Sequence, residues 1–566
     1  MSDDNRFWWP FDLSPAEEAA TGAFRERMRR EPQALDVGAA TLAADLLAHM
    51  MGRHVRAILE RDSLPHTCHL LNGWGNARLD GRPLLEHLEP FVHRDEAGRP
   101  YILQRDPEGE FHPWQAIAYT VMAGVDPLHP LPGVRASFKD IALNSRQLNV
   151  TDGIELGHLL YALAALEPEP RADTAPFLMG ADVCDVTALM ERAVDAHHHG
   201  GFEVCRKVHL TEGLCAAAAN IRGMERFRKD AQGFLEGQLD ILFVLGAALE
   251  QVDLLAARGE KGGPGTLLHQ LRESLLIDSP LENHCYYVGH LIELATLAHV
   301  AGFPIPQETW SAMAFVANRL NHTFPRFLPH TVFAECFLHF GHYRRAITLL
   351  LEVDRARAGG RALTPADFAR YTVDFDCLPP LPAGVSLDAA GPAPTGEGLY
   401  TLAPPPAGGR PEFEAIVARY SQGASAHLKA RGGFPHFRRM APPSWPRAFH
   451  YELLDYGGDV GAEIHLESDA VRPLGPRVQA LRERVAGRFP GLEVTWDGGW
   501  SRGRGRLRVL FPAGTPVERV ASGIQTLVEE TFADLDAAAS GLSVPVAPWA
   551  LPLATPASSP VVPPAR

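Results

Sequence analysis

The sequence lacks the short motifs that mark most nucleotide-binding and hydrolase sites. It has no GxxxxGK(S/T) phosphate loop, no strand-borne GxGxxG, no GxSxG elbow, no HExxH and no set of kinase motifs. The glycine-rich GEKGGPG that begins at Gly259 falls in a predicted loop and lacks the Ser/Thr geometry that follows a phosphate loop. We therefore expect no nucleotide cofactor.

Cysteine pairs, an export signal and a long apolar run are also missing. The seven cysteines form no CxxC pair and no zinc-finger spacing, which is typical of reduced thiols and predicts a cytoplasmic protein. Cys215, Cys285 and Cys336 fall in apolar helical segments, and we interpret them as buried core residues in preference to soft metal ligands. The first residues, MSDDNRFWWPFDLSP, do not resemble a secretory signal. No apolar stretch of about 18 residues is free of charge or His, so we expect no membrane partner.

Positive charge is in deficit. Lys and Arg number 53 against 68 Asp and Glu, and the formal net charge of −15 makes nucleic acid an unlikely partner for the surface as a whole. One local basic stripe comprises Arg502, Arg504, Arg506 and Arg508. We interpret it as a charged edge strand facing solvent, with binding of phosphate or of an acidic peptide as the alternative.

A chain of 566 residues exceeds one ordinary core, and its composition changes along its length. We predict a helical domain over 1–377, a linker rich in Pro, Gly and Ala over 378–411, an α+β domain over 412–540 and a disordered tail over 541–566. Within the first domain, the stretch 62–105 is punctuated by Gly, Pro and Asn, which favours a functional or covering loop.

The fold class that these patterns predict is mainly α. Between 141 and 354, apolar helices of ten to twenty residues alternate with Gly- and Pro-rich loops in a weak repeat, which indicates an α/α barrel, a toroid or a helical-hairpin array. Over 412–540 the expected order is helix, two strands, helix, two strands, helix. That order predicts a smaller α+β sandwich with helices on one side of an antiparallel sheet.

The strand pair FHYELLDYGGDVGAEIHLES, with the helix-strand-strand-helix order that follows it, loosely resembles a domain of unknown function appended to some restriction-type nucleases. The resemblance covers about 412–535 and no part of the helical region. It implies no catalytic residue, because the nuclease centre of such proteins lies outside that domain.

Pairs of His and Glu at helical spacing are the strongest candidates for a site. Glu155/His158, His209/Glu212 and His290/Glu293 each lie three positions apart, so each pair projects from one helix face. Carboxylate-bridged sites in helical proteins use such pairs. We therefore expect iron, manganese or zinc on a ligand set drawn from Glu155, His158, His209, Glu212, Glu282, His284, His290, Glu293, His330 and Glu335.

The same side chains have a metal-free interpretation. His209, Glu212, His290 and Glu293 in an apolar interior would act as general acids and bases with shifted pKa values. The run 197–199, three consecutive His before two Gly, is interpreted as a helix C-terminus.

A second row of polar residues alternates along the predicted strand pair. It comprises His450, Glu452, Glu463, His465 and Glu467. Such a row is typical of the solvated face of an antiparallel sheet, and we expect that arrangement, with a metal site as the alternative.

Together these features favour a tailoring enzyme that acts on a peptide or a small molecule in a His/Glu-lined helical interior. In this hypothesis the α+β domain recognises a protein partner. A noncatalytic helical-repeat scaffold and a defence-type effector touching nucleic acid remain the alternatives.

Overall fold

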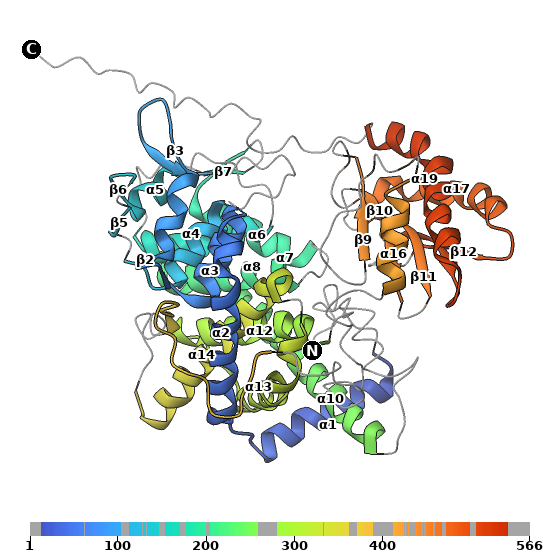
Figure 1. The fold of residues 1–566 in the computed structure, drawn as a ribbon. Coiled ribbons are helices and arrows are strands. Elements are labelled where there is room, and N and C mark those ends of the chain that lie inside the picture. Colours follow the sequence, from blue (N-terminus) through green and yellow to red (C-terminus); the bar gives the residue numbers. More distant parts are fainter. Residues whose placement is uncertain are drawn as a thin grey trace, which may run out of the picture.

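The computed structural model describes most of the chain, in separate ranges. The described residues are 13–61, 63–103, 113–126, 128–131, 133–145, 153–169, 177–179, 182–199, 204–257, 280–331, 333–361, 371–388, 411–423, 425, 428, 437–442, 445, 449–456, 459–466, 471–498 and 505–540. The predicted linker falls largely, and the predicted tail wholly, outside them. The described chain is mainly α-helical, as predicted (Figure 1).

The first two helices begin where the sequence signals place them. In α1 (Pro15–Arg30), the Ser14 side chain accepts from the Glu17 backbone N–H while the Glu17 carboxylate accepts from the Ser14 N–H, which is a complete capping box. In α2 (Val37–Leu59), Asp36 caps the helix by accepting from the Ala39 N–H.

The prediction of a loop over 62–105 is wrong at its start. Leu64–Trp74 form helix α3, which has Pro65 in its first turn and ends at Gly75 with φ of 69°. Pro lacks an N–H and tolerates the first turn, while a left-handed Gly ends a helix, so the Pro and Gly that suggested a loop bound a helix instead. The consequence is that the segment contributes a buried helix face.

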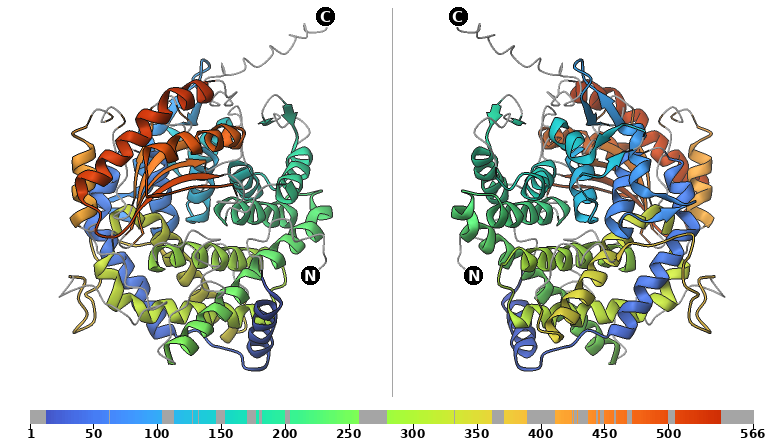
Figure 2. Two further views of the ribbon diagram at one scale, coloured as in Figure 1. Left: turned by 90° about the vertical axis from the view of Figure 1, so that its right-hand side faces the viewer. Right: turned by 90° about the vertical axis from the view of Figure 1, so that its left-hand side faces the viewer.

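Six helices pack in a closed sequence of neighbours: α3 on α4, α4 on α6, α6 on α8, α8 on α12, α12 on α14, and α14 back on α3. Their bounds are α4 (Pro113–Met122), α6 (Gly153–Leu166), α8 (Val204–Asn220), α12 (Pro280–Val300) and α14 (Phe333–Ala358), with α3 as given. Figure 2 shows these helices from two further sides.

The helical part contains further helices and short strands. The helices are α5 (Phe138–Asn144), α7 (Val186–His199), α9 (Arg228–Leu239), α10 (Ile241–Ala257) and α13 (Gln307–Phe327), with 3-10 turns η2 (Leu84–Phe91), η4 (Glu225–Phe227) and η5 (Leu328–His330). Four small antiparallel hairpins are β1 (Arg78–Leu79) with β2 (Arg82–Pro83), β3 (Val92–Arg94) with β4 (Pro100–Ile102), β5 (Pro130–Leu131) with β6 (Ala136–Ser137), and β7 (Phe177–Met179) with β8 (Asp182–Cys184).

Glycines set how closely the six helices approach. A Cβ added at Gly157 on α6 would overlap the carbonyl of His209 on α8, and one added at Gly213 would overlap the carbonyl of Gly157. At the α3–α14 contact a Cβ on Gly73 would lie 2.6 Å from the Gly341 Cα. At the α12–α14 contact a Cβ on Gly289 would lie 2.8 Å from the Tyr343 backbone nitrogen. These helix pairs therefore meet backbone to backbone.

The C-terminal part has its own apolar cluster, separate from that of the helical part. It contains α16 (Pro411–Tyr420), β9 (Phe437–Met440), β10 (Phe449–Asp455), β11 (Val460–Leu466), η8 (Arg472–Leu474), α17 (Gly475–Arg488), β12 (Glu493–Asp497), β13 (Arg506–Phe511) and α19 (Val517–Ser540). The sheet is antiparallel in the order β12-β13-β11-β10-β9 (Figure 1). Strand β9 was not predicted, and the other elements match the expected order.

The expectation that the polar row of this sheet is solvated is wrong. His450, Glu452, Glu463 and His465 are each at most 4% exposed. They alternate with Phe449, Tyr451 and the other residues that face the helices, so the opposite face of these strands is buried too. Glu467 lies outside the described residues.

The basic stripe is described only in part, since Arg502 and Arg504 lie outside the described residues. Arg506 Nη1 donates to the Tyr456 hydroxyl (2.9 Å), and Arg508 Nη2 lies 3.7 Å from Glu493 Oε1. Both guanidiniums are partly buried. These two arginines thus belong to ion-pair networks of the sheet.

The stretch Glu225–Gln251 is long and apolar enough to cross a membrane by length and composition. However, 78% of its most apolar window is buried inside the protein. Helices α9 and α10, which make up most of it, pack against α8, α12, α13 and α1. A core helix passes the same test, so the stretch is weak support for a membrane span.

The glycine contact between α6 and α8 leads to a stability prediction. Gly157→Ala places a methyl group against an unyielding backbone carbonyl, and we expect it to lower the free energy of unfolding by about 1–3 kcal/mol. Gly233→Ala on α9 is the matched control, because no atom lies within 4 Å of its added Cβ. The control should be neutral or stabilising by up to about 1 kcal/mol. Chemical denaturation of both variants measures the difference, and equal effects would contradict the close contact.

Candidate functional site

Each of the six central helices contributes one aromatic side chain to a single cluster. We call it the hexad; it consists of His69 (α3), Tyr119 (α4), His158 (α6), His209 (α8), His290 (α12) and His342 (α14). Consecutive members are in contact around a closed circuit, with ring centroids between 3.9 Å (His290–His342) and 5.8 Å (His69–His342) apart. Five of the six are at most 2% exposed, and His69 is partly buried.

The Nδ1 atoms of three hexad histidines lie within hydrogen-bond distance of oxygen atoms. His69 Nδ1 lies 2.7 Å from the Pro65 carbonyl, and His290 Nδ1 lies 2.7 Å from the Tyr286 carbonyl. His342 Nδ1 lies 2.8 Å from the Glu293 carboxylate. A carbonyl cannot donate, so Nδ1 of His69 and of His290 must carry the proton, and the neutral imidazole then has its lone pair on Nε2. Metal-binding histidines are oriented in this way by their second nitrogen.

The Nε2 atoms of His290 and His342 are buried and accept no hydrogen bond from the described residues. Burial lowers the pKa of both imidazoles well below the usual value, with neighbouring histidines adding to the effect. Both side chains are therefore neutral at pH 7. Leaving a buried acceptor unsatisfied costs about 1–3 kcal/mol, so two such nitrogens in one cluster indicate a site for a ligand atom or ion.

A hydrogen-bonded chain passes through His209. The Tyr119 hydroxyl lies 3.1 Å from His209 Nε2, and His209 Nδ1 lies 2.7 Å from Glu212 Oε2. Burial acts to lower the pKa of His209, but nearby Cys205 and Glu212 outweigh it and raise that pKa to about 10. Burial raises the pKa of Glu212, against the effect of His209. A proton and a metal ion would thus compete for His209.

The second carboxylate of the site, Glu293, forms a buried ion pair with Arg345. Arg345 Nη1 lies 3.5 Å from Glu293 Oε1 and donates to the Asn72 amide oxygen, and both charged side chains are 1% exposed. Burial raises the pKa of Glu293 to about 7, opposed by Arg345 and His209. Glu293 therefore titrates near neutral pH while it orients His342.

Three side chains at the hexad have the spacing that a metal ion would need. One ligand atom each of Cys205, His209 and His290 lies within 4.8 Å of the other two. Cys205 precedes His209 by four positions on α8, so both project from one helix face. Thiolate and imidazole are ligands that zinc prefers.

The structure brings five of the predicted site residues together: His158, His209, Glu212, His290 and Glu293. The carboxylates of the two glutamates, however, lie outside the hexad and contact the Nδ1 atoms of His209 and His342. They were expected to bind the metal ion directly. The carboxylate of Glu155 accepts from the backbone N–H of Trp114 (3.1 Å), where it satisfies the start of α4.

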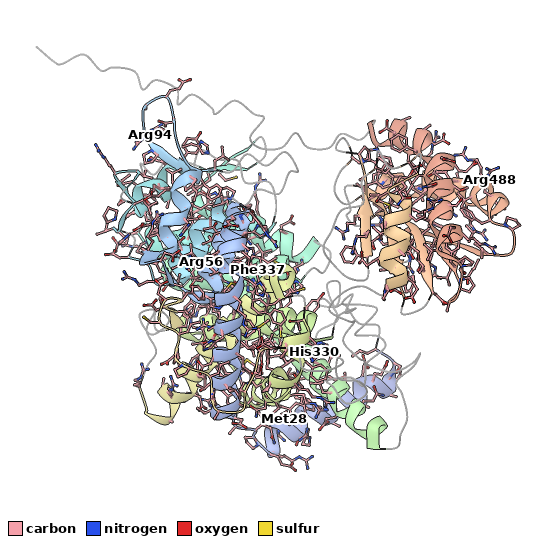
Figure 3. The ribbon with its side chains drawn as sticks, viewed as in Figure 1. Met28, Arg56, Arg94, His330, Phe337 and Arg488 are labelled. Atoms are coloured by element: carbon pink, nitrogen blue, oxygen red, sulfur yellow. The ribbon has the colours of Figure 1, made fainter. Side chains whose placement is uncertain are left out.

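The remaining predicted ligands do not join the hexad. His284 is buried on α12, six residues before His290 and therefore on a different helix face. His330 is in η5 and makes none of the ring contacts of the hexad; it is labelled in Figure 3. The side chains of Glu282 and Glu335 lie outside those that the structure describes.

Sequence reasoning missed half of the hexad: His69, Tyr119 and His342. The usable signal was the Gly-His dipeptide, which occurs at 157–158, 289–290 and 341–342. In each case the glycine makes a close helix contact and the next residue is a hexad histidine. His69 and Tyr119 have no such signal. His197 of the 197–199 run lies elsewhere, with its Nε2 beside Thr211 and Gln238.

Comparison with known proteins found no match. No family model matches the sequence, and neither a curated protein nor a solved structure does.

The Arg345–Glu293 pair leads to a second prediction. Arg345→Met leaves a buried carboxylate without its cation, and we expect the free energy of unfolding to fall by about 3–5 kcal/mol. The loss should be larger at high pH, because Glu293 without Arg345 binds a proton more tightly in the folded state and stability falls as the pH rises. Denaturation curves at several pH values measure it.

Arg355→Met on the same helix is the matched control. Arg355 is more than half exposed in its ion pair with Glu352, so its loss should change stability by less than about 1 kcal/mol. Adding Glu293→Gln to Arg345→Met should recover part of the loss. Equal effects of the two Arg variants would contradict the buried pair.

Proposed function

We propose that the helical region is a metal-dependent enzyme whose ion is held by Cys205, His209 and His290. The observation that carries this proposal is the hexad itself, in which buried imidazoles have their Nδ1 atoms fixed from outside and leave Nε2 for a ligand. Buried neutral imidazoles such as those of His290 and His342 gain stability when a cation satisfies their Nε2 atoms.

The kinds of ligand atom narrow the choice of metal ion. One thiolate and two imidazoles suit zinc or iron better than manganese, which favours oxygen ligands. Three protein ligands would leave a further coordination position open, and a bound ion there supplies Lewis acidity and a more acidic bound water. Glu293, with its pKa near 7, and the Tyr119 hydroxyl and Glu212 carboxylate on either side of His209 are the proton-transfer groups beside it.

The architecture supports a substrate in the helical interior. We propose that the six helices form the inner wall of an α/α toroid, since each packs on the next and the last packs on the first. The substrate class is a small molecule or a peptide that the enzyme modifies in a biosynthetic pathway. The α+β part, with its own apolar cluster, would form a second domain that recognises a protein partner.

A metal-free proton-transfer enzyme is the second candidate. The hydrogen-bonded chain from Tyr119 through His209 to Glu212 favours it, because that chain is complete without an ion. Metal content separates the two candidates.

The test is metal analysis of untagged protein purified without chelator, followed by reconstitution of the stripped protein with Zn²⁺ or Co²⁺. The His209→Ala/His290→Ala variant removes two of three ligands, and we expect its affinity for the ion at this site to fall by more than about 100-fold. The Co²⁺ form should show a sulfur-to-cobalt charge-transfer band that disappears in Cys205→Ser.

His330→Ala is the matched control, because this histidine lies outside the hexad. It should keep the metal content and the cobalt spectrum of the unmodified protein. Circular dichroism checks that each variant is folded. If the folded double variant kept its full metal content, or if the unmodified protein gave no charge-transfer band, the metal proposal would be wrong and the proton-transfer candidate would take its place.

A further inference from the structure

The buried polar face of the C-terminal sheet is a second cluster of metal-type ligands. Strands β10 and β11 pair antiparallel with His450 opposite His465 and Glu452 opposite Glu463. All four are buried, and β10 and β11 lie inside the sheet between β9 and β13. Two carboxylates directly opposite each other repel, so the arrangement requires positive charge nearby.

Three of these residues have the spacing of ligands around one ion. His450 Nε2 lies 3.3 Å from Glu452 Oε2, and His465 Nδ1 lies 3.7 Å from Glu452 Oε1. One ligand atom from each of the three lies within 4.8 Å of the others. Ligand atoms about 2.1 Å from a tetrahedral zinc ion are about 3.4 Å apart, so only small side-chain movements separate this geometry from a coordinated one.

The fourth residue acts as a support. His465 Nε2 donates to Glu463 Oε2 (2.7 Å), which leaves the lone pair of the neutral imidazole on Nδ1, facing Glu452. The Tyr456 hydroxyl donates to Glu463 Oε1 (2.6 Å), and Arg506 Nη1 lies 3.5 Å from Oε2. A carboxylate that fixes the second nitrogen of a metal-binding histidine is the usual outer partner in such sites.

One cation already contacts the inner carboxylate. Arg439 Nε donates to Glu452 Oε2 (3.2 Å) from the neighbouring strand β9. This contact is made to Oε2, whereas Oε1 is the oxygen that lies 3.7 Å from His465 Nδ1. Arg439 is about one-third exposed on its side chain, so it can move aside or stay as an outer partner.

We propose that His450, Glu452 and His465 form a second site for a divalent transition-metal ion of the zinc type. Two imidazoles and one carboxylate make up a ligand set found in zinc enzymes, and a fourth position would remain for water or substrate. The site belongs to the sheet and does not depend on the proposed function of the hexad.

The test measures metal stoichiometry in the full chain. After removal of metal by chelator, Zn²⁺ or Co²⁺ is titrated against a chromogenic competitor. If both sites bind, the unmodified protein should take up about two ions. Glu452→Gln and His450→Ala/His465→Ala should each lose one ion while the thiolate band of the Co²⁺ form, which reports the hexad site, remains.

Glu493→Gln is the matched control, since it makes the same chemical change on an exposed carboxylate of edge strand β12. It should retain full stoichiometry. Glu452→Gln keeps the side-chain shape, so it tests the site even if the double His variant does not fold. If Glu452→Gln bound as many ions as Glu493→Gln, with the same affinity, the cluster would be a hydrogen-bonded network and the inference would be wrong. Loss of the thiolate band alone would count against the hexad site only.

Discussion

Close approach of helix backbones at glycine is the constraint on which the helical site depends. An added Cβ at Gly157 or Gly289 would overlap the backbone of the neighbouring helix, and one at Gly341 would lie 2.9 Å from the Trp74 ring; each glycine is followed by a hexad histidine. A larger residue at any of these positions would therefore push against the neighbouring helix. The imidazoles at the next positions reach a common centre because the backbones that carry them lie this near to one another.

Around that centre, burial and neighbouring charges have opposite effects on the pKa values of the carboxylates. Desolvation raises the pKa of Glu212 and Glu293 and lowers those of His290 and His342, so it favours the neutral form of every titratable group. Arg345 remains charged at the same depth, with Glu293 as its counter-ion. The result is a nearly neutral, hydrogen-bonded shell that encloses nitrogen lone pairs.

The sequence predicted local structure well, but it predicted poorly which side chains from different helices meet in space. The strand pair 449–466 follows from a signal a few residues long, and it was predicted. Spacing of three placed His209 with Glu212 and His290 with Glu293 on shared helix faces, but it gave no information on which atom each carboxylate contacts. His69 and Tyr119 come from segments without a distinctive pattern, and their positions depend on contacts across more than a hundred residues. On the sheet, the alternating pattern correctly predicted that His450 and His465 lie on the same face. Their burial was not predicted, because it depends on what covers that face.

The glycine contacts also limit how the helices can move. Sliding α6 along α8 by one residue would shift it by about 1.5 Å and rotate its face by about 100°, which would turn a side chain into the space that Gly157 occupies. A rotamer change cannot relieve the contact at Gly157, because the opposing atoms belong to the backbone of α8. The directions of the imidazoles are thus set by the register of the helices that carry them.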